Sequence, residues 1–170
     1  MTTLSSTLIR DVEMQLDGSM PNLRIGIDLV PVADVAASVD RFGDRYLHRV
    51  FTPHERATCR TTDGAPGSVR AYSAESLAAR FAAKEAVVKV LRPDGARPEW
   101  CSIEVHRHDV GWCEIRLSGS ATAMAAQAGI EQLTVSLTHE SMMAAAIVVG
   151  MCSSTIRTSV RTVATDWREE

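Results

Sequence analysis

The sequence lacks several features that would mark a class of protein. It has no CxxC pair, no apolar run of membrane-spanning length and no strong charge of either sign, since the net charge is −3 over 170 residues. This charge gives no reason to expect nucleic acid or an anionic membrane as a partner. The start of the chain has no basic region followed by an apolar core, so we expect a cytoplasmic protein. Four widely spaced cysteines are predicted to be reduced packing residues: Cys59, Cys101, Cys113 and Cys152.

The composition is that of one globular domain. Hydrophobic residues make up 45% of the chain and charged residues 23%, which is ordinary for a protein of this size. We predict a polar leader over residues 1–22, a domain over 23–152 and a polar tail over 153–170. The segment 61–70, TTDGAPGSVR, is predicted to be a loop, either an inert connector or a lid.

The longest predicted helix covers residues 75–91, with Ser73 as a candidate N-cap. Its apolar residues recur at helical spacing and form one stripe. Glu85 lies four residues before Lys89, which puts both side chains on one face of the helix. The pair is either a surface ion pair of little energetic weight or a metal-binding carboxylate with a lysine placed to meet phosphate charge. The second interpretation needs another carboxylate from elsewhere in the chain.

Asp28 is the candidate for that second carboxylate. It interrupts the apolar strand predicted over residues 23–30. An aspartate is seldom buried without a partner or a metal. The alternative is that Asp28 stands at the end of the strand and caps the next helix.

The other segments predict short helices and antiparallel strands. A Thr52–Glu55 capping box marks one helix start. Taken in order, these elements predict an α+β fold with an antiparallel sheet packed on the long central helix. The additional elements are helices over 31–42, from Thr52 and over 118–129, and strands over 102–107, 112–117, 133–139 and 143–149.

His106 and His108 share one face of the hairpin predicted over residues 102–117. Two histidines at this spacing can bind a metal. No third ligand is evident near them in the sequence, so a solvated hairpin end is the favoured interpretation.

Four segments resemble a known family, the 4′-phosphopantetheinyl transferases of the small holo-acyl-carrier-protein synthase type. The glycine–acid strand or the AKEA segment alone would be a weak match, and the order and spacing of all four make the resemblance specific. The segments are GIDLV at 26–30, RVFTPHE at 49–55, RFAAKEAVVKVL at 80–91 and VSLTHESMMAAAIVV at 135–149.

The resemblance implies a reaction and a site. Such enzymes move the phosphopantetheine arm of coenzyme A onto a serine of an acyl carrier protein, of the fatty-acid or polyketide type, and release 3′,5′-ADP. The family's Mg²⁺ ligands match Asp28 and Glu85. Lys89 matches the lysine that stabilises or protonates the leaving phosphate, and Glu85 or a metal-bound water is the candidate base for the serine proton. Family members commonly form homotrimers with sites between protomers. Binding of coenzyme A is expected of Lys89, Arg80, His139 and Arg92.

Three positions depart from the family's pattern. Asp34 stands where relatives often carry an arginine that meets the carrier, Arg92-Pro93-Asp94-Gly95 replaces a glycine-rich turn, and Glu140 replaces a Ser or Thr that faces phosphate. These departures motivate an alternative, a non-catalytic relative that binds a carrier protein with an altered nucleotide site. A weaker alternative is a small metal-dependent phosphohydrolase that uses the same carboxylates.

Overall fold

A computed structural model describes residues 22–61 and 71–153 of the chain. The loop predicted over 61–70 lies outside the described residues except for Thr61. The predicted leader and tail also lie outside them, apart from Asn22 and Ser153 at the two boundaries. The proposed division of the chain into leader, domain and tail therefore stays a prediction.

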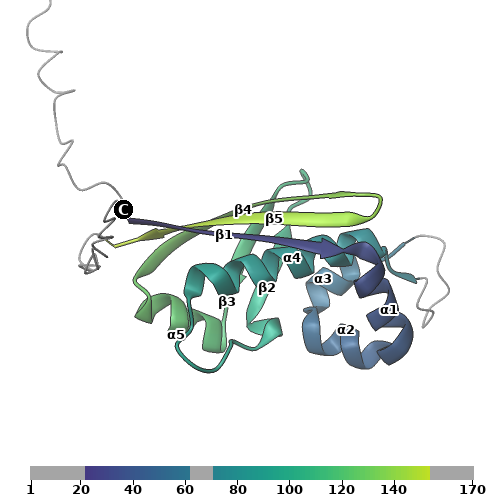
Figure 1. The fold of residues 1–170 in the computed structure, drawn as a ribbon, viewed down its shortest axis with the longest axis horizontal. Helices are drawn as coiled ribbons and strands as arrows, with labels where there is room; N and C mark the ends of the chain where they lie inside the picture. The colour runs from purple at the N-terminus through teal and green to yellow at the C-terminus, as the bar shows by residue number, and fades with distance from the viewer. Residues whose placement is uncertain (1–21, 62–70, 154–170) are drawn as a thin grey trace, which may run out of the picture.

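A three-stranded antiparallel sheet forms one layer of the molecule (Figure 1). Its strands are β1 (Asn22–Pro31), β4 (Ile130–Glu140) and β5 (Met143–Cys152), and β5 lies in the middle. Successive side chains of a strand point to opposite faces. The even-numbered residues of β1, among them Gly26 and Asp28, therefore face the helix layer while the odd-numbered ones face away. The predicted antiparallel sheet is confirmed.

Helix α4 (Ala74–Leu91) runs along one face of this sheet (Figure 1). Ser73 caps it as predicted, because the Ser73 hydroxyl accepts a hydrogen bond from the backbone N–H of Ser76 at 3.0 Å. Arg92 ends the helix in the left-handed conformation, with φ of 49°. The prediction of a single apolar stripe was incomplete. Helix α4 is buried on nearly all sides because the sheet covers one side while α1, α5 and the hairpin β2–β3 cover others.

Three short helices form a group at one end of α4 (Figure 1). They are α1 (Val32–Phe42), α2 (Asp44–Val50) and α3 (Pro53–Thr58). The predicted capping box of α3 is present. The hydroxyl of Thr52 accepts from the N–H of Glu55, and the carboxylate of Glu55 accepts from the N–H of Thr52 at 2.8 Å.

The second half of the chain adds a hairpin and a helix beside α4. A 3₁₀ helix, η2 (Trp100–Ser102), leads into the antiparallel pair β2 (Ile103–Arg107) and β3 (Cys113–Leu117). Helix α5 (Gly119–Gln127) then connects the hairpin to β4. The predicted strand boundaries agree to within one residue for β2 and β3.

A buried ion pair, which the sequence did not reveal, joins α3 to α4. The Nζ of Lys84 lies 2.9 Å from the Oε2 of Glu55, and both side chains are fully buried. Lys84 also donates to the carbonyl oxygens of Trp100 and Ile103, while Oε1 of Glu55 accepts from the N–H of Val105. Glu55 therefore does more than cap α3, since it links α3, α4 and β2.

The sheet face that points away from α4 carries exposed apolar side chains. They lie on β1 and β5, and no element within the described part of the chain covers them. The set comprises Leu23, Ile25, Ile27, Leu29, Met143, Ile147 and Met151. Among the described residues, none of the helices combines the length and the apolar character needed to cross a membrane.

Candidate active site

Two carboxylates from different elements line one hollow between β1 and α4. Asp28 lies on the helix-facing side of β1, and Glu85 lies near the middle of α4. Their side chains are 18% and 22% exposed, so both are accessible from the hollow although each is mostly shielded. The structure thus brings together the two residues predicted to hold a metal.

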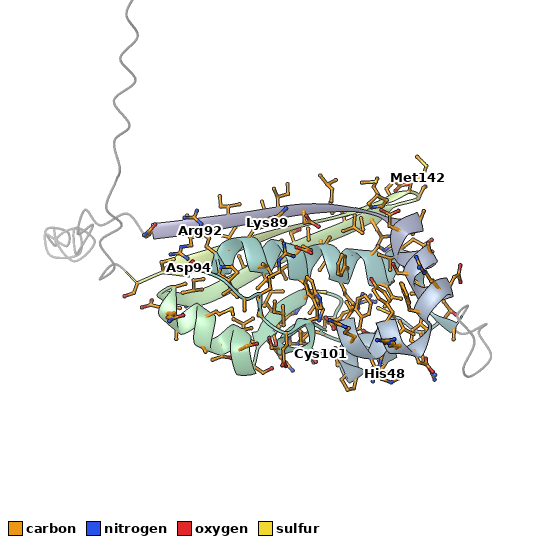
Figure 2. All side chains as sticks on the ribbon, turned by 60° about the horizontal axis from the view of Figure 1, so that its bottom comes forward. His48, Lys89, Arg92, Asp94, Cys101 and Met142 are labelled. Carbon is orange, nitrogen blue, oxygen red and sulfur yellow. The ribbon has the colours of Figure 1, made fainter. Side chains whose placement is uncertain are left out.

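Lys89 also reaches this region, from one turn beyond Glu85 (Figure 2). Its Nζ lies 2.8 Å from Oδ1 of Asp28 and 2.6 Å from the carbonyl oxygen of Ile27. Glu85 lies 3.5 Å from Nη1 of Arg97 instead. The structure therefore pairs Lys89 with Asp28 across two elements, and the simple surface pair of Glu85 and Lys89 within one helix is not what forms.

The hollow at Asp28 and Glu85 is lined by both polar and apolar side chains. Besides the two carboxylates it is lined by Asp34, Ser38 and Tyr46, with a volume of ≈ 460 Å³. Burial raises the pKa of the Tyr46 phenol, so it stays protonated and available as a hydrogen-bond donor. Partly hydrated carboxylates at a hollow are the donor set that Mg²⁺ prefers, because this ion keeps several waters and binds through one or two carboxylates.

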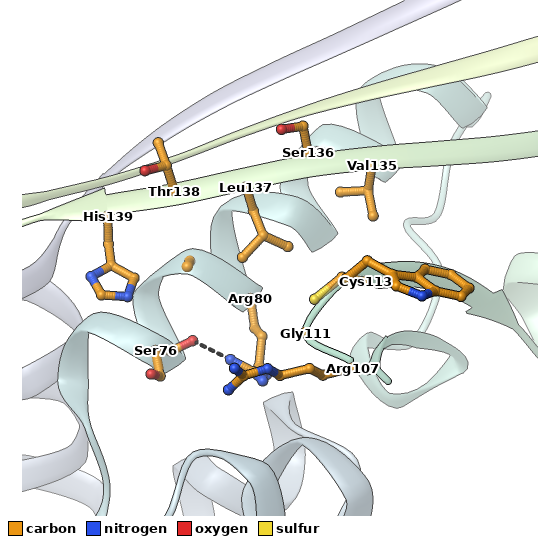
Figure 3. A pocket seen from close by; sticks show the side chains of 12 residues that line it. Ser76, Arg80, Arg107, Gly111, Cys113, Val135, Ser136, Leu137, Thr138 and His139 are labelled. Carbon is orange, nitrogen blue, oxygen red and sulfur yellow. Dashed lines mark hydrogen bonds between the residues drawn. The ribbon is translucent and has the colours of Figure 1, made fainter. Parts of the chain in front are cut away.

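A second hollow lies on the other side of α4, and Arg80 and His139 both line it (Figure 3). Arg80 is 4% exposed. Its Nη1 donates to the carbonyl oxygen of Ser76 at 3.0 Å and its Nη2 to the hydroxyl of Thr58 at 3.1 Å. Its buried Nε has no hydrogen-bond partner among the described residues. A buried guanidinium with an unused donor is suited to bind an anion.

The two hollows share no lining residue. Arg80 and Glu85 are five residues apart on α4, which turns their side chains by roughly 140° around the helix axis. Asp28 on β1 and His139 on β4 are likewise separated by β5, the middle strand. Within one chain, the predicted coenzyme A residues Arg80 and His139 therefore lie apart from the predicted metal ligands.

Arg92, the remaining residue predicted to bind coenzyme A, lies in neither of these two hollows. It follows the last turn of α4 (Figure 2) and lines a third hollow with Arg24, Asp94 and Gln127. Glu140, one of the departures from the family's pattern, is exposed at the end of β4 and accepts a hydrogen bond from the hydroxyl of Ser141 at 3.1 Å. The structure brings neither residue to the carboxylate hollow.

Sequence reasoning missed a second arginine in the hollow of Arg80. Arg107, at the end of β2, lines this hollow together with Trp112 and Cys113 (Figure 3). The signal for it was present, because strand alternation places Arg107 on the opposite face of the hairpin from His106. Two guanidinium groups in one hollow favour a ligand with more than one negative charge.

The expectation that the histidine pair has no third ligand nearby was wrong. The register of the hairpin pairs His106 with Glu114. Glu114 lies on β3, so its proximity depends on hairpin register and could not be judged from spacing along β2 alone.

Comparison with known proteins decides the family. A sequence model of the 4′-phosphopantetheinyl transferase superfamily matches residues 24–146. The chain belongs to this superfamily. A holo-[acyl-carrier-protein] synthase of Halothermothrix orenii is 36% identical over 126 residues, covering 74% of this chain and 94% of that protein. A protein of the same name from Chloroflexus aurantiacus is 42% identical over 135 residues, covering 73% and 94%.

Solved structures of such synthases share the fold. The Helicobacter pylori holo-[acyl-carrier-protein] synthase, solved in complex with coenzyme A, is 29% identical and superposes with a TM-score of 0.61, covering 75% of this chain and 99% of that one. The Mycobacterium tuberculosis acyl carrier protein synthase is 35% identical, with a TM-score of 0.55 and coverage of 76% and 96%. The predicted transferase family, its holo-acyl-carrier-protein synthase type and its α+β fold are confirmed.

Proposed function

We propose that this transferase moves the 4′-phosphopantetheine arm of coenzyme A to a serine hydroxyl of an acyl carrier protein and releases 3′,5′-ADP. The serine oxygen forms a bond to the phosphorus that carries the pantetheine arm, and the bond from that phosphorus to the bridging oxygen breaks. The observation that carries the proposal is that Asp28 and Glu85 line one hollow while Lys89 donates a hydrogen bond to Asp28, at positions that match the family's motifs.

Asp28 and Glu85 are suited to hold Mg²⁺, because both are partly exposed carboxylates on rigid elements that line the same hollow. When bound, this ion would neutralise negative charge on the pyrophosphate. Glu85 is also positioned by the helix to take the proton of the serine hydroxyl. The ion pair between Glu85 and Arg97 is long, with 3.5 Å between Oε1 and Nη1, and it leaves the Glu85 carboxylate accessible.

Lys89 serves the leaving group in this proposal. Its Nζ already contacts Asp28, one of the two carboxylates that line the hollow, and the side chain is half-exposed, so it can turn from Asp28 toward a phosphate oxygen. An ammonium group there stabilises the charge that develops on 3′,5′-ADP as the bridging bond breaks.

Arg80, Arg107 and His139 are suited to bind the phosphates of the nucleotide end of coenzyme A. They line one hollow, and the buried Nε of Arg80 offers a donor that no described group uses. Solved relatives from Chronobacterium ammoniagenes and Helicobacter pylori are complexes with coenzyme A, which supports the same ligand here. Arg92 lines a different hollow, so we propose it as a separate contact to coenzyme A.

We propose that the active molecule is a homotrimer with its sites between protomers. The exposed apolar face of β1 and β5 supports association. The separation of the carboxylate hollow from the Arg80 hollow also supports it, because one coenzyme A can then contact Glu85 of one protomer and Arg80 of its neighbour.

Two of the departures from the family's pattern concern recognition. Asp34 lies in the first turn of α1 and lines the carboxylate hollow with Asp28. A carboxylate at this rim repels an acidic carrier, so we propose a carrier of the fatty-acid or polyketide type whose contacting surface is less acidic at this point. Glu140 is exposed and paired with Ser141, so it does not block the Arg80 hollow.

Intact-mass spectrometry of apo carrier proteins incubated with this protein, coenzyme A and Mg²⁺ tests the function. We expect one phosphopantetheine to be added to the carrier, and none after chelation of Mg²⁺. Asp28→Asn and Glu85→Gln are each expected to lower the rate by at least about 100-fold, since each removes charge that stabilises the transition state. The exposed Asp40 of α1 provides the matched control, and Asp40→Asn should transfer at the wild-type rate.

Other outcomes point elsewhere. Full activity of both carboxylate variants would exclude the proposed metal site. Carrier binding without transfer, together with no coenzyme A binding in calorimetry, would identify the non-catalytic relative. Release of phosphopantetheine to water in the absence of a carrier would identify a phosphohydrolase.

A further inference from the structure

The hairpin β2–β3 carries a cluster of metal-ligating side chains away from the carboxylate hollow. His106, His108 and Glu114 each offer one donor atom, and these three atoms lie within 4.8 Å of one another. His106 and Glu114 are direct cross-strand partners, while His108 follows the last residue of β2. The rings of the two histidines meet edge to face, with centroids 5.0 Å apart.

His106 is oriented by groups behind it. Its Nδ1 lies 3.4 Å from Oε1 of Glu104, and Oε2 of Glu104 accepts a hydrogen bond of 2.6 Å from the hydroxyl of Thr52. The ring of His54 stacks on the ring of His106 with centroids 4.0 Å apart. A carboxylate on one ring nitrogen is the usual partner of a metal-binding histidine. This contact leaves Nε2 of His106 as the nitrogen for a metal.

His108 has a buried nitrogen that its surroundings do not satisfy. Its Nε2 has no hydrogen-bond partner among the described residues, although Oε2 of Glu114 lies 3.3 Å away. The ring stacks on Trp112 with centroids 3.6 Å apart, so it cannot easily turn toward solvent. The other oxygen of Glu114 accepts a 2.6 Å hydrogen bond from Nε of Arg116, which fixes the carboxylate. A buried nitrogen that lies 3.3 Å from a carboxylate oxygen without a well-aligned hydrogen bond leaves both groups able to bind a shared cation.

We propose that His106, His108 and Glu114 bind one divalent transition-metal ion of the zinc class. Two imidazoles and one carboxylate form a known three-ligand set for Zn²⁺, with water in the fourth position. Ligands at zinc distances lie roughly 3.3 Å apart around a tetrahedral ion, so small side-chain rotations bring the three donor atoms together. This site differs in chemistry from the carboxylate hollow, because imidazole nitrogen selects Zn²⁺ over Mg²⁺.

The consequence for the fold is local. Arg107 and Trp112, which neighbour the cluster in the hairpin, line the hollow of Arg80. A metal that ties β2 to β3 at His108 and Glu114 would hold the end of the hairpin, and with it this wall of the hollow. The site thus acts as a structural clamp on the hairpin, and its existence does not depend on the proposed transfer reaction.

Calorimetric titration of the metal-stripped full chain with Zn²⁺ tests the proposal. Excess Mg²⁺ is present to occupy carboxylate sites, and a Cys101→Ser background removes the exposed thiol. We expect one Zn²⁺ per chain and a rise in Tm with Zn²⁺, since a ligand that binds only the folded state stabilises it. His108→Ala and Glu114→Gln are each expected to weaken binding by more than about 10-fold. His48→Ala, which removes an exposed histidine of α2, should bind like the wild type.

Circular dichroism in the absence of metal establishes whether the variants remain folded. If His108→Ala does not fold, the isosteric variant Glu114→Gln still tests the site. Glu104→Gln is expected to weaken binding by about 10- to 100-fold through loss of the partner of His106. Absence of Zn²⁺ binding by the full chain with an unaltered hairpin, or unchanged binding in both ligand variants, would overturn the proposal. In that event the cluster consists of ion pairs alone.

Discussion

At the scale of single residues, the pair of Glu55 and Lys84 is the least expected feature of the molecule. Both charges are fully buried 2.9 Å apart. Burial lowers the pKa of Lys84, and the charge of Glu55 opposes that effect. A buried pair contributes little by comparison with apolar residues of the same size, but removing one partner leaves an uncompensated charge.

We therefore expect Glu55→Gln to lower the free energy of unfolding by about 3–5 kcal/mol, as measured by urea denaturation. Lys84→Met should also be destabilising. The double variant should lose less than the sum of the two, because it contains no unpaired charge. Strictly additive losses would show that the two side chains do not act as a pair.

Cys59 makes a contribution to the pH dependence of the free energy of unfolding that can be measured separately. Burial raises the pKa of its thiol to about 12, whereas a thiol in the unfolded chain ionises near about 8.5. The folded chain therefore keeps a proton that the unfolded chain loses. Cys59 contributes stability that is fully present below about pH 8.5 and is lost as the pH rises toward the folded pKa.

In urea denaturation above about pH 9, the wild type should lose about 1.4 kcal/mol of unfolding free energy per pH unit more than Cys59→Ala does. Comparing slopes removes the constant cost of the cavity left by the substitution. Cys113→Ala, at a half-exposed thiol, is the control and should keep the wild-type slope. Equal slopes for all three proteins would mean that Cys59 ionises in the folded state.

At the scale of elements, the approach of β1 to α4 determines how the two carboxylates meet. A Cβ on Gly26 would overlap the carbonyl oxygen of Ala86. Glycine at position 26 lets β1 lie directly against α4. The contact is close to both carboxylates, because Gly26 is two residues before Asp28 and Ala86 is the residue after Glu85. The alanines of α4 have the same effect from the other side, because they are buried and small.

Gly26→Ala is expected to lower the free energy of unfolding by about 1–3 kcal/mol and to reduce transfer activity further by displacing Asp28 from Glu85. Gly150→Ala is the matched comparison on β5. Its Cβ would lie 2.6 Å from a methyl group of Val90 and not against backbone. Because a side chain adjusts more easily than backbone, Gly150→Ala should retain more transfer activity than Gly26→Ala when equal amounts of folded protein are assayed. The opposite ranking would show that the approach of β1 to α4 does not set the site.

The sequence predicted those parts of the fold that depend on local pattern. The cap at Ser73, the capping box at Thr52 and the strands of the hairpin follow from short-range spacing and chain chemistry. The partnership of Asp28 with Lys89 was not predicted, and neither was that of Glu55 with Lys84, because each joins elements that are distant in sequence. Asp28 and Glu85 were singled out because charged residues interrupt an apolar strand and an alanine-rich helix. Their nearness became visible only with the packing of β1 on α4.

At the scale of the whole molecule, the outer sheet face is a surface that sequence reasoning could not assign. Alternation along β1 and β5 leaves Ile25 and Ile27 61% and 57% exposed. A row of such side chains on the surface of a globular domain is typical of a subunit interface. Association through this face agrees with the homotrimer that the family resemblance implies.

The proposed sharing of one site between two protomers can be tested by mixing inactive chains. Glu85→Gln lacks the carboxylate and Arg80→Ala lacks the guanidinium, so each homotrimer should be inactive. If one site takes Glu85 from one protomer and Arg80 from the next, a site is intact only where an Arg80→Ala chain supplies Glu85 and a Glu85→Gln chain supplies Arg80. Random reassembly of equal amounts should make about one quarter of the sites intact, the product of two halves.

We expect the mixture, after dissociation and reassembly, to recover up to about a quarter of the wild-type transfer activity. Mixing chains that also carry Ile25→Lys and Ile27→Lys should restore nothing, because charges on the outer face of β1 prevent association. Light scattering should show these chains as monomers, while Val110→Lys, at an exposed apolar residue of the hairpin turn, keeps the wild-type mass. Hybrid trimers without recovered activity would mean that Glu85 and Arg80 serve the same site within one chain, which their positions on opposite sides of α4 argue against.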